Sequence, residues 1–226
     1  MSDPRVVAVV AAHNEEATVG QTVKELLAIH GVGEVVVAVD GSTDRTAQEA
    51  RSAGARVFEA GARRGKGAAL EAALRQGPTA DWYLFMDGDV GATASEAARL
   101  LEKVRSGGAD LAIGRLPALS GGGFGLVRRL AGGLIRLLSG PETSAPLSGQ
   151  RAITNEALQA CRPLAAGFGV ETAMTIDAVR LGFRVVEVDV AMTHRATGRG
   201  ISGFLHRGGQ GMDILRAVLP RALRLR

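Results

Sequence analysis

The sequence has few cysteines and few aromatic residues, and each shortage excludes a class of protein. Cys161 is the single cysteine among 226 residues, which excludes an intrachain disulfide and a cysteine-based zinc site. One thiol also fits a reducing compartment, where disulfides are rare. Aromatic residues make up 4% of the chain, so side chains that could stack on bases are scarce. We therefore expect no nucleic-acid partner.

Long hydrophobic runs are missing as well. The amino-terminal run Val6–Ala12 is too short to span a bilayer and lacks the cleavage-site context of a signal peptide, so it is typical of a buried strand. We expect a cytoplasmic protein. With 46% hydrophobic and 22% charged residues, the composition predicts one globular core rather than a disordered chain.

Acidic residues are absent from one long stretch of this chain of net charge +4. No Asp or Glu occurs between Leu111 and Pro141, where four arginines occur. Residues 194–226 contain seven arginines, and Asp213 is the one acid among them. Such clusters attract phosphate groups, whether on a small acceptor or on an anionic lipid.

Two segments of this basic region combine arginine with leucine and isoleucine. They are residues 124–138 and residues 214–226, in the second of which Pro220 should kink or end a helix. Both segments are typical of helices that lie on an anionic membrane surface. The alternative is that their apolar sides pack against the sheet or against the second subunit of a homodimer.

The first half of the chain alternates short apolar runs with helical periodicity. This alternation predicts an α/β fold with a mostly parallel sheet flanked by helices. We expect strands at residues 6–12, 35–39, 56–58, 83–86 and 111–113, and helices at about residues 15–29, 43–53, 66–76 and 94–106.

Four polar motifs follow the first four predicted strands. They are residues 13–16, 40–44, 64–67 and 87–89. In open α/β sheets, ligands bind in a crevice outside the carboxyl ends of the strands. We therefore expect the four motifs to converge on one crevice.

The last of these motifs, Asp87-Gly88-Asp89, holds two carboxylates one residue apart. At the end of an extended strand, the first and third side chains point the same way, so the pair could share a divalent cation with a diphosphate. The alternative is an ordinary polar turn after a strand.

Asp40 and Lys66 stand out in the second and third motifs. Asp40 could accept a hydrogen bond from a nucleobase imide, or it could cap a helix, a task that Ser42 or Asp44 could also perform. Lys66 lies between two glycines, where its ammonium and nearby backbone amides could meet a diphosphate. The alternative for Lys66 is a solvated side chain.

On these motifs the chain resembles the family 2 glycosyltransferases, in the branch of polyprenyl-phosphate mannosyl- and glucosyltransferases and glucosyl-3-phosphoglycerate synthases. The matching segments run from residue 6 to about residue 213 and read AAHNEE (11–16), VDGSTD (39–44), RGKGAAL (64–70), DGD (87–89), PLSGQRA (146–152), GFGVE (167–171) and THR (193–195). The resemblance implies a GT-A fold that binds a nucleoside diphosphate sugar with Mg or Mn. It also implies one glycosyltransferase domain over residues 1–226, with a nucleotide-sugar-binding half (1–114) and an acceptor-binding half (115–226) ending in the basic amphipathic helix.

The resemblance assigns roles residue by residue. Asp89 and His194 would bind the metal, although His194 could also be a partly buried histidine near a strand end. Asp87, Asp89 and Glu171 would be catalytic, with Glu171 orienting hydroxyl groups and acting as general base if transfer inverts; its alternative is a capping acid at a helix start. The nucleotide-sugar contacts would be Ala12, Asn14, Glu15, Asp40, Lys66, Asp87 and Gly88. The acceptor contacts would be Gly149, Arg151, Arg199 and Arg207, the last two in a glycine-rich segment that either closes over the site or is a solvated linker.

The function implied is metal-dependent transfer of glucose or mannose from a UDP-linked donor to a phosphorylated acceptor. Polyprenyl phosphate is slightly favoured as the acceptor, which would place the enzyme at the inner membrane face, and a small acceptor such as 3-phosphoglycerate is the alternative. A nucleotidyltransferase is a further alternative, but a Gly-rich signature with Arg does not follow the first strand. The last alternative is a noncatalytic membrane-surface module. The resemblance does not decide whether transfer retains or inverts the configuration of the sugar, because its two branches differ.

Overall fold

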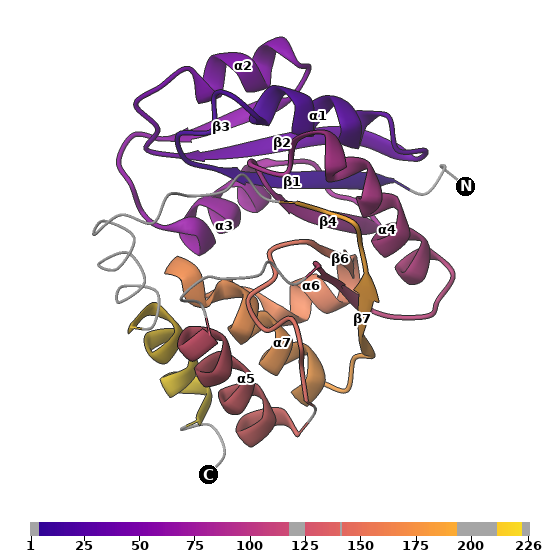
Figure 1. The fold of residues 1–226 in the computed structure, drawn as a ribbon, viewed down its shortest axis with the longest axis vertical. Helices are drawn as coiled ribbons and strands as arrows, with labels where there is room; N and C mark the ends of the chain where they lie inside the picture. Colours follow the sequence, from indigo (N-terminus) through magenta and orange to yellow (C-terminus); the bar gives the residue numbers. More distant parts are fainter. Residues whose placement is uncertain (1–4, 118–124, 141, 194–211, 223–226) are drawn as a thin grey trace.

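The computed structural model describes residues 5–117, 125–140, 142–193 and 212–222, with no account of the side chains of residues 125 and 126. These residues form a seven-stranded sheet flanked by helices on both faces (Figure 1). The mostly parallel α/β architecture predicted from the sequence is confirmed. The strands are β1 (Val6–Ala12), β2 (Val32–Asp40), β3 (Arg56–Ala60), β4 (Trp82–Asp87), β5 (Leu111–Arg115), β6 (Arg151–Thr154) and β7 (Val185–Asp189).

The strand order is β3-β2-β1-β4-β6-β5-β7. The pairs among β3, β2, β1 and β4 are parallel, as is the pair of β5 with β7. Strand β6 pairs antiparallel with both β4 and β5. The start of β6 therefore lies at the edge of the sheet where β1, β2 and β4 end.

The α-helices are α1 (Val19–Leu27), α2 (Thr46–Ser52), α3 (Lys66–Gln76), α4 (Ala97–Arg105), α5 (Gly125–Ser139), α6 (Asn155–Cys161) and α7 (Val170–Arg180), and the 3₁₀-helices are η1 (Gly91–Glu96) and η2 (Gly167–Gly169).

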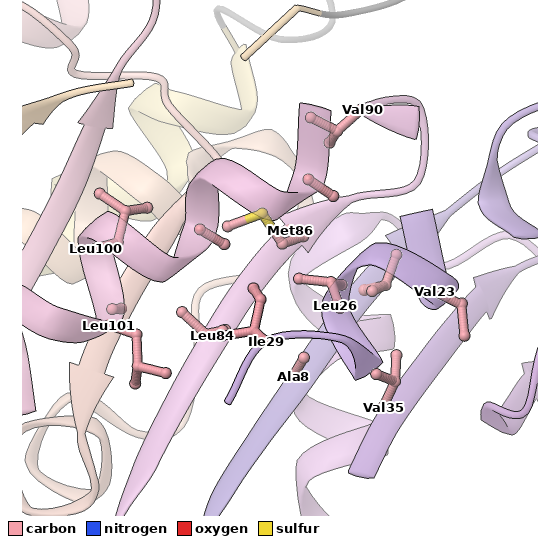
Figure 2. Packing of buried hydrophobic residues seen from close by; sticks show 14 of the residues in the cluster. Ala8, Val23, Leu26, Ile29, Val35, Leu84, Met86, Val90, Leu100 and Leu101 are labelled. Carbon is pink, nitrogen blue, oxygen red and sulfur yellow. The ribbon is translucent and has the colours of Figure 1, made fainter. Parts of the chain in front are cut away.

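Alternating side chains of the central strands enter two separate cores. On one face, Val6, Ala8 and Val10 of β1 pack against α1 and α4, and Figure 2 shows this packing around Leu26 and Leu100. On the other face, Val7 and Val9 of β1 are in the core that α3, α6 and α7 cover.

A third core lies between α5, α7 and the helical residues 212–222. Its buried members include Ile135 of α5, Ile176 of α7 and Ile214, each 0% exposed. The apolar sides of α5 and of residues 212–222 therefore pack against each other and against α7, and not against the sheet as the sequence-based alternative expected. Pro220 does not end the last helix, which continues to residue 222. No described helix is long and apolar enough to cross a membrane.

Several predicted boundaries need correction. The helix expected at residues 15–29 is limited to α1, because residues 16–18 form a turn, and the helix expected at 43–53 is limited to α2. The helix expected at 94–106 is divided into η1 and α4. Strand β2 is longer than predicted because Val32 pairs with Val6 at the far end of β1.

Candidate functional site

The carboxyl ends of β1, β2 and β4 meet the start of β6 at one edge of the sheet. Ala11 of β1 pairs with Asp87, the last residue of β4, and Phe85 of β4 pairs with Arg151, the first residue of β6. This register brings Gly149 beside Asp87. A Cβ on Gly149 would lie 2.5 Å from Lys66 Nζ and 2.6 Å from Asp87 Oδ2. The predicted convergence of motifs therefore includes the segment before β6.

Hydrogen bonds connect the loops after β1 and β2. The main-chain amide of Asn14 donates to Ser42 Oγ at 3.0 Å, and the amide of Thr43 donates to Asn14 Oδ1 at 2.9 Å. Asn14 has a φ of 57°, a left-handed conformation that asparagine tolerates better than most residues. The side chain of Asn14 therefore makes a hydrogen bond within the protein. The resemblance had assigned Asn14 to the nucleotide sugar.

The same two loops start α2. Asp44 Oδ1 accepts from the amide of Thr46 at 3.0 Å and from its hydroxyl at 2.5 Å, and Thr46 Oγ1 accepts from the amide of Glu15 at 2.8 Å. Burial alone raises the pKa of Asp44, but these bonds from Thr46 and one from the amide of Glu16 lower it overall. Asp44 therefore accepts the hydrogen bonds at the start of α2, and Asp40 is not needed to cap that helix.

Asp40 ties the loop before α3 to the end of β2. It is 5% exposed, and its two oxygens accept from the amides of Arg64 at 2.6 Å and Gly65 at 2.9 Å. Its carbonyl oxygen accepts from Nδ1 of His13 at 2.7 Å, which fixes a proton on that nitrogen. Asp40 thus positions the segment that leads into Lys66.

Lys66 lies between two carboxylates. Its ammonium pairs with Asp87 Oδ1 and, at 2.6 Å, with Glu171 Oε1. The side chains are 15% exposed for Lys66, 25% for Asp87 and 7% for Glu171, so the cluster is largely removed from water. Burial alone lowers the pKa of Lys66, but the charges of Asp87 and Glu171 raise it above its usual value. The predicted alternative of a solvated lysine does not describe this side chain.

The glycines around Lys66 make room for the protein's own backbone. A Cβ on Gly67 would overlap the carbonyl oxygen of Ala165, and one on Gly65 would lie 3.1 Å from the Cα of Gly167. The start of α3 therefore packs backbone to backbone against residues 165–167. This contact brings Glu171, in the first turn of α7, to the ammonium of Lys66.

Asp87-Gly88-Asp89 is not an extended pair. Strand β4 ends at Asp87, and residues 88–89 form a turn. The amide of Gly88 donates to the carbonyl of Ala11 at 2.9 Å, and its carbonyl accepts from Thr22 Oγ1 at 3.1 Å, which bends the chain toward α1. Gly88 is also packed against the end of β1, where a Cβ would lie 3.1 Å from that of Ala12. The expectation that the motif is an extended strand end is therefore wrong, because the extended backbone stops at Asp87.

Arg151 is buried beneath the Lys66 cluster. It is 1% exposed, and its guanidinium donates to the carbonyl of Ser148 at 2.8 Å and to Thr175 Oγ1 at 3.0 Å. Burial lowers its pKa to about 10, which still leaves it charged at neutral pH. A contact between Arg151 and an acceptor would require this side chain to leave the core.

The space enclosed by the cluster is too small for a sugar ring. The cavity lined by Lys66, Arg151 and Glu171 has a volume of about 10 Å³, room for one water molecule. A larger ligand would therefore have to bind outside this cavity, at the open edge of the sheet.

The predicted metal ligands lie partly outside the described residues. Within residues 5–117, 125–140, 142–193 and 212–222, no three His, Cys, Asp or Glu side chains form a group that could hold a metal ion. Asp89 is described and half-buried, whereas His194 falls outside the described residues, as do Arg199 and Arg207. One carboxylate still fits Mg²⁺, which proteins hold through one or two carboxylates together with substrate phosphates.

Gln150 belongs to the site and was missed by the sequence analysis. It is 0% exposed, and its side-chain amide bonds both the main chain and the carboxylate of Asp87. Little in the sequence indicated a functional role for Gln150, because glutamine is uncharged and does not ionise. The one available signal was its place inside the PLSGQRA segment, directly after Gly149.

The fold and this edge of the sheet define an α/β protein with a charged site at the carboxyl ends of its strands. The model of the family "Glycosyl transferase family 2" matches residues 7–161. The chain belongs to this family.

Curated relatives come from the archaeon Haloferax volcanii. "Dolichyl-phosphate hexose transferase" is 28% identical over 225 residues, which cover 96% of this chain and 95% of the relative. "Glycosyltransferase AglJ" is 28% identical over 191 residues, and "Glycosyltransferase AglD" is 31% identical over 200 residues. The matches cover 82% and 80% of this chain but 62% of AglJ and 32% of AglD.

Among solved structures, glucosyl-3-phosphoglycerate synthase from Mycobacterium tuberculosis has the same fold. Its complex with phosphoglyceric acid matches with a TM-score of 0.81 and 28% identity, over 97% of this chain and 80% of the other. Its complex with Mn²⁺, uridine diphosphate and phosphoglyceric acid gives a TM-score of 0.81 and 27% identity, over 97% and 79%. The GT-A fold implied by the sequence is confirmed.

Proposed function

We propose that this protein transfers a hexose, glucose or mannose, from a nucleoside diphosphate sugar to a phosphorylated acceptor. The observation that carries the proposal is the Lys66–Asp87–Glu171 cluster, which lies at the carboxyl edge of the sheet beside Asp89. Family membership supports it, as do the relative named dolichyl-phosphate hexose transferase and the similar structure named glucosyl-3-phosphoglycerate synthase.

The donor in this proposal is a UDP-sugar bound by the first half of the chain, residues 1–114. The loops after β1 and β2 would receive the base and ribose near Ala12, Glu15 and Asp40, where the hydrogen bonds of Asn14 and Asp40 have already fixed the backbone. Preorganised loops reduce the entropy lost on binding. The choice of UDP is supported by the M. tuberculosis synthase, which was crystallised with uridine diphosphate and Mg²⁺.

Mg²⁺ or Mn²⁺, when bound, would supply positive charge to the departing diphosphate. Asp89 would hold the metal ion, together with the expected ligand His194 and oxygens of the diphosphate. Lys66 would add a fixed ammonium near the same phosphates.

The second half, residues 115–226, would bind the acceptor. Glu171 opens α7 and is held by Lys66 at 2.6 Å, so its carboxylate has one defined position from which to orient a hydroxyl group of the sugar or an oxygen of the acceptor. In an inverting reaction this carboxylate would take the acceptor's proton as general base. Gly149, Arg199 and Arg207 would contact the acceptor, and Arg151 would act from beneath the cluster.

Polyprenyl phosphate is the acceptor that we favour. The relative that matches nearly end to end is named for dolichyl phosphate. Exposed leucines on the outer side of α5 and of residues 212–222, including Leu137 (77% exposed) and Leu219 (58%), accompany exposed arginines such as Arg129 and Arg136. This outer side is typical of peripheral contact with an anionic membrane. A small acceptor like phosphoglyceric acid is the second candidate, supported by the synthase crystallised with it.

Calorimetric titration with UDP and with GDP, each with and without Mn²⁺, tests the donor. We expect Mn²⁺-dependent binding of UDP, much weakened by Asp89→Asn. Transfer from UDP-glucose and GDP-mannose is then measured to polyprenyl phosphate in vesicles and to 3-phosphoglycerate in solution. Binding of neither nucleotide, or unchanged transfer by Asp89→Asn, would contradict the proposal.

A further inference from the structure

We propose that Gln150 is a positioning residue of the transfer reaction, which holds the carboxylate of Asp87 in the orientation that places Lys66 between Asp87 and Glu171. This inference rests on the proposed function, because the reaction it serves is the hexose transfer at the same edge of the sheet.

The backbone of Gln150 is fixed from both directions along the chain. Its carbonyl accepts from the amide of Gly114 of β5 at 2.8 Å, and its amide donates to Ser148 Oγ at 3.3 Å. Gly114 leaves no spare room, because a Cβ there would lie 3.2 Å from the Cβ of Gln150. The side chain of Gln150, directly before β6, is thus directed at the end of β4 by contacts with Ser148 and with Gly114 of β5.

The side-chain amide makes two bonds to one residue. Nε2 of Gln150 donates to Asp87 Oδ2 at 2.7 Å, and Oε1 accepts from the main-chain amide of Asp87 at 3.2 Å. Only a group that donates and accepts at once can make this pair of bonds, and a carboxamide is such a group. The two bonds fix the side chain of Asp87 relative to its own backbone.

The orientation of Asp87 then decides where Lys66 can lie. With Oδ2 bonded to Gln150, it is Oδ1 that pairs with Lys66. Lys66 in turn pairs with Glu171 at 2.6 Å. If the carboxylate of Asp87 rotated, Lys66 could no longer pair with Asp87 and Glu171 at the same time. Glu171, which we propose orients a hydroxyl group, would then lose its ion pair with Lys66.

The neutrality of Gln150 also matters. Among the described residues, the cations Lys66 and Arg151 lie close to the carboxylates of Asp87 and Glu171, and all four side chains are largely removed from water. A carboxylate in place of the amide would add a further negative charge directly beside Asp87, where desolvation makes repulsion costly. Protonation of the new carboxyl group would remove that charge and restore a donor toward Asp87.

The test is the substitution Gln150→Glu, with transfer followed against pH. At about pH 8 we expect kcat to fall about a hundredfold relative to the wild type, with the KM for the UDP-sugar changed less than about threefold. The ratio of variant to wild-type kcat should rise at least about tenfold as the pH is lowered to about 5.5, because the buried carboxyl group becomes protonated. Gln150→Met removes both bonds without adding charge and should lower kcat with no pH-dependent recovery.

The matched control is Gln21→Glu on the exposed face of α1. There too a glutamine Nε2 donates to a carboxylate, that of Glu25 at 2.6 Å, but in water. We expect kcat within about twofold of the wild type at every pH. A wild-type protein that transfers no sugar would overturn the proposed function. A wild type that transfers, with a Gln150→Glu variant of equal activity or one whose deficit is the same at every pH, would overturn this inference alone.

Discussion

Helix α3 carries two buried ion clusters that connect it to the second half of the chain, and they differ in composition. At its start, the cation Lys66 lies between two carboxylates, Asp87 and Glu171. Five residues later, the carboxylate of Glu71 lies among two guanidiniums and a main-chain amide. It accepts from Arg162 at 3.0 Å, Arg75 at 3.0 Å and the amide of Leu164 at 3.1 Å.

The two clusters also differ in position, and the position decides which of them a ligand can reach. The Lys66 cluster is at the edge of the sheet, and each of its carboxylates belongs to a different segment of the site. The Glu71 cluster lies about 7.5 Å farther along the helix axis, within the core side of α3. Both hold α3 against residues 162–171, but only the first lies where we propose that the phosphates of the donor bind. Breaking them one at a time should separate activity from stability.

The largest effect should come from Lys66→Met. Removing the ammonium leaves Asp87 and Glu171 as buried carboxylates without their shared cation, which costs about 3–5 kcal/mol of unfolding free energy. Transfer should fall by about a thousandfold or more because the fixed charge near the diphosphate is lost as well. Chemical denaturation and initial rates measure both, with Lys24→Met on exposed α1 as the control. Full activity in Lys66→Met would mean that the two clusters do not differ in function.

Gly67→Ala should disrupt the backbone contact between α3 and residues 165–167, which lies between the two clusters. The added methyl group would overlap the carbonyl of Ala165, so the start of α3 and residues 165–167 must separate, at a cost of about 3 kcal/mol. Both stability and kcat should fall, since Glu171 moves relative to Lys66. Gly133→Ala in α5 is the control, because a Cβ there meets nothing within 4 Å. A thermal unfolding temperature equal to that of the wild type would contradict the packing described.

Glu71→Gln should lower stability while kcat stays within about threefold of the wild type. Losing the charge-assisted bonds from Arg162 and Leu164 should cost about 2 kcal/mol at neutral pH.

Burial alone raises the pKa of Glu71, but bonds from Arg162, Leu164 and Arg75 lower it below its usual value. Its contribution to stability is therefore fully present above the unfolded-state pKa of about 4.3 and is lost as the pH falls through the lower folded-state pKa. The stability difference between Glu71→Gln and wild type should shrink over that acid range. A difference that stays constant down to about pH 2 would show that the charge of Glu71 is not what stabilises α3.

The smallest effect should come from Arg75→Ala, which sharpens the comparison within the Glu71 cluster. The side chain of Arg75 is 66% exposed and pairs with Glu71 four residues earlier on the same helix. Such exposed pairs contribute about 0.5 kcal/mol or less. Urea denaturation should place this variant close to the wild type, whereas Arg162→Ala, at a side chain 20% exposed, should lose about 2 kcal/mol. Equal losses of stability in the two variants would mean that solvent exposure does not determine how much each guanidinium contributes.

The sequence predicted the strands and helices whose periodicity is local. Strand β1 and helix α3 were predicted with their observed boundaries, because a run of valines and an alanine-rich repeat carry their own signals. Strands β6 and β7 were not predicted. Strand β6 has four residues and begins with a buried arginine, which contradicts the usual apolar pattern of a strand.

The site was predictable where charge or glycine marked it. Lys66, Asp87 and Glu171 were identified from motifs far apart in the chain, and the structure brings them together. Their roles stay predictions. Gln150 and Glu71 were missed because their importance depends on pairing: Gln150 on the antiparallel register of β6, and Glu71 on the turn around Arg162. Neither register nor turn is encoded by residue type alone.

The backbone contact between Gly65-Lys66-Gly67 and residues 165–167 has a consequence for how this protein can evolve. A contact without side chains cannot be remodelled by exchanging one side chain for another, so it is either kept whole or lost. The spacing of Lys66 and Glu171 is therefore insulated from substitutions elsewhere in the second half of the chain. Surfaces such as the outer side of α5 can diverge while Lys66 and Glu171 keep their relative positions.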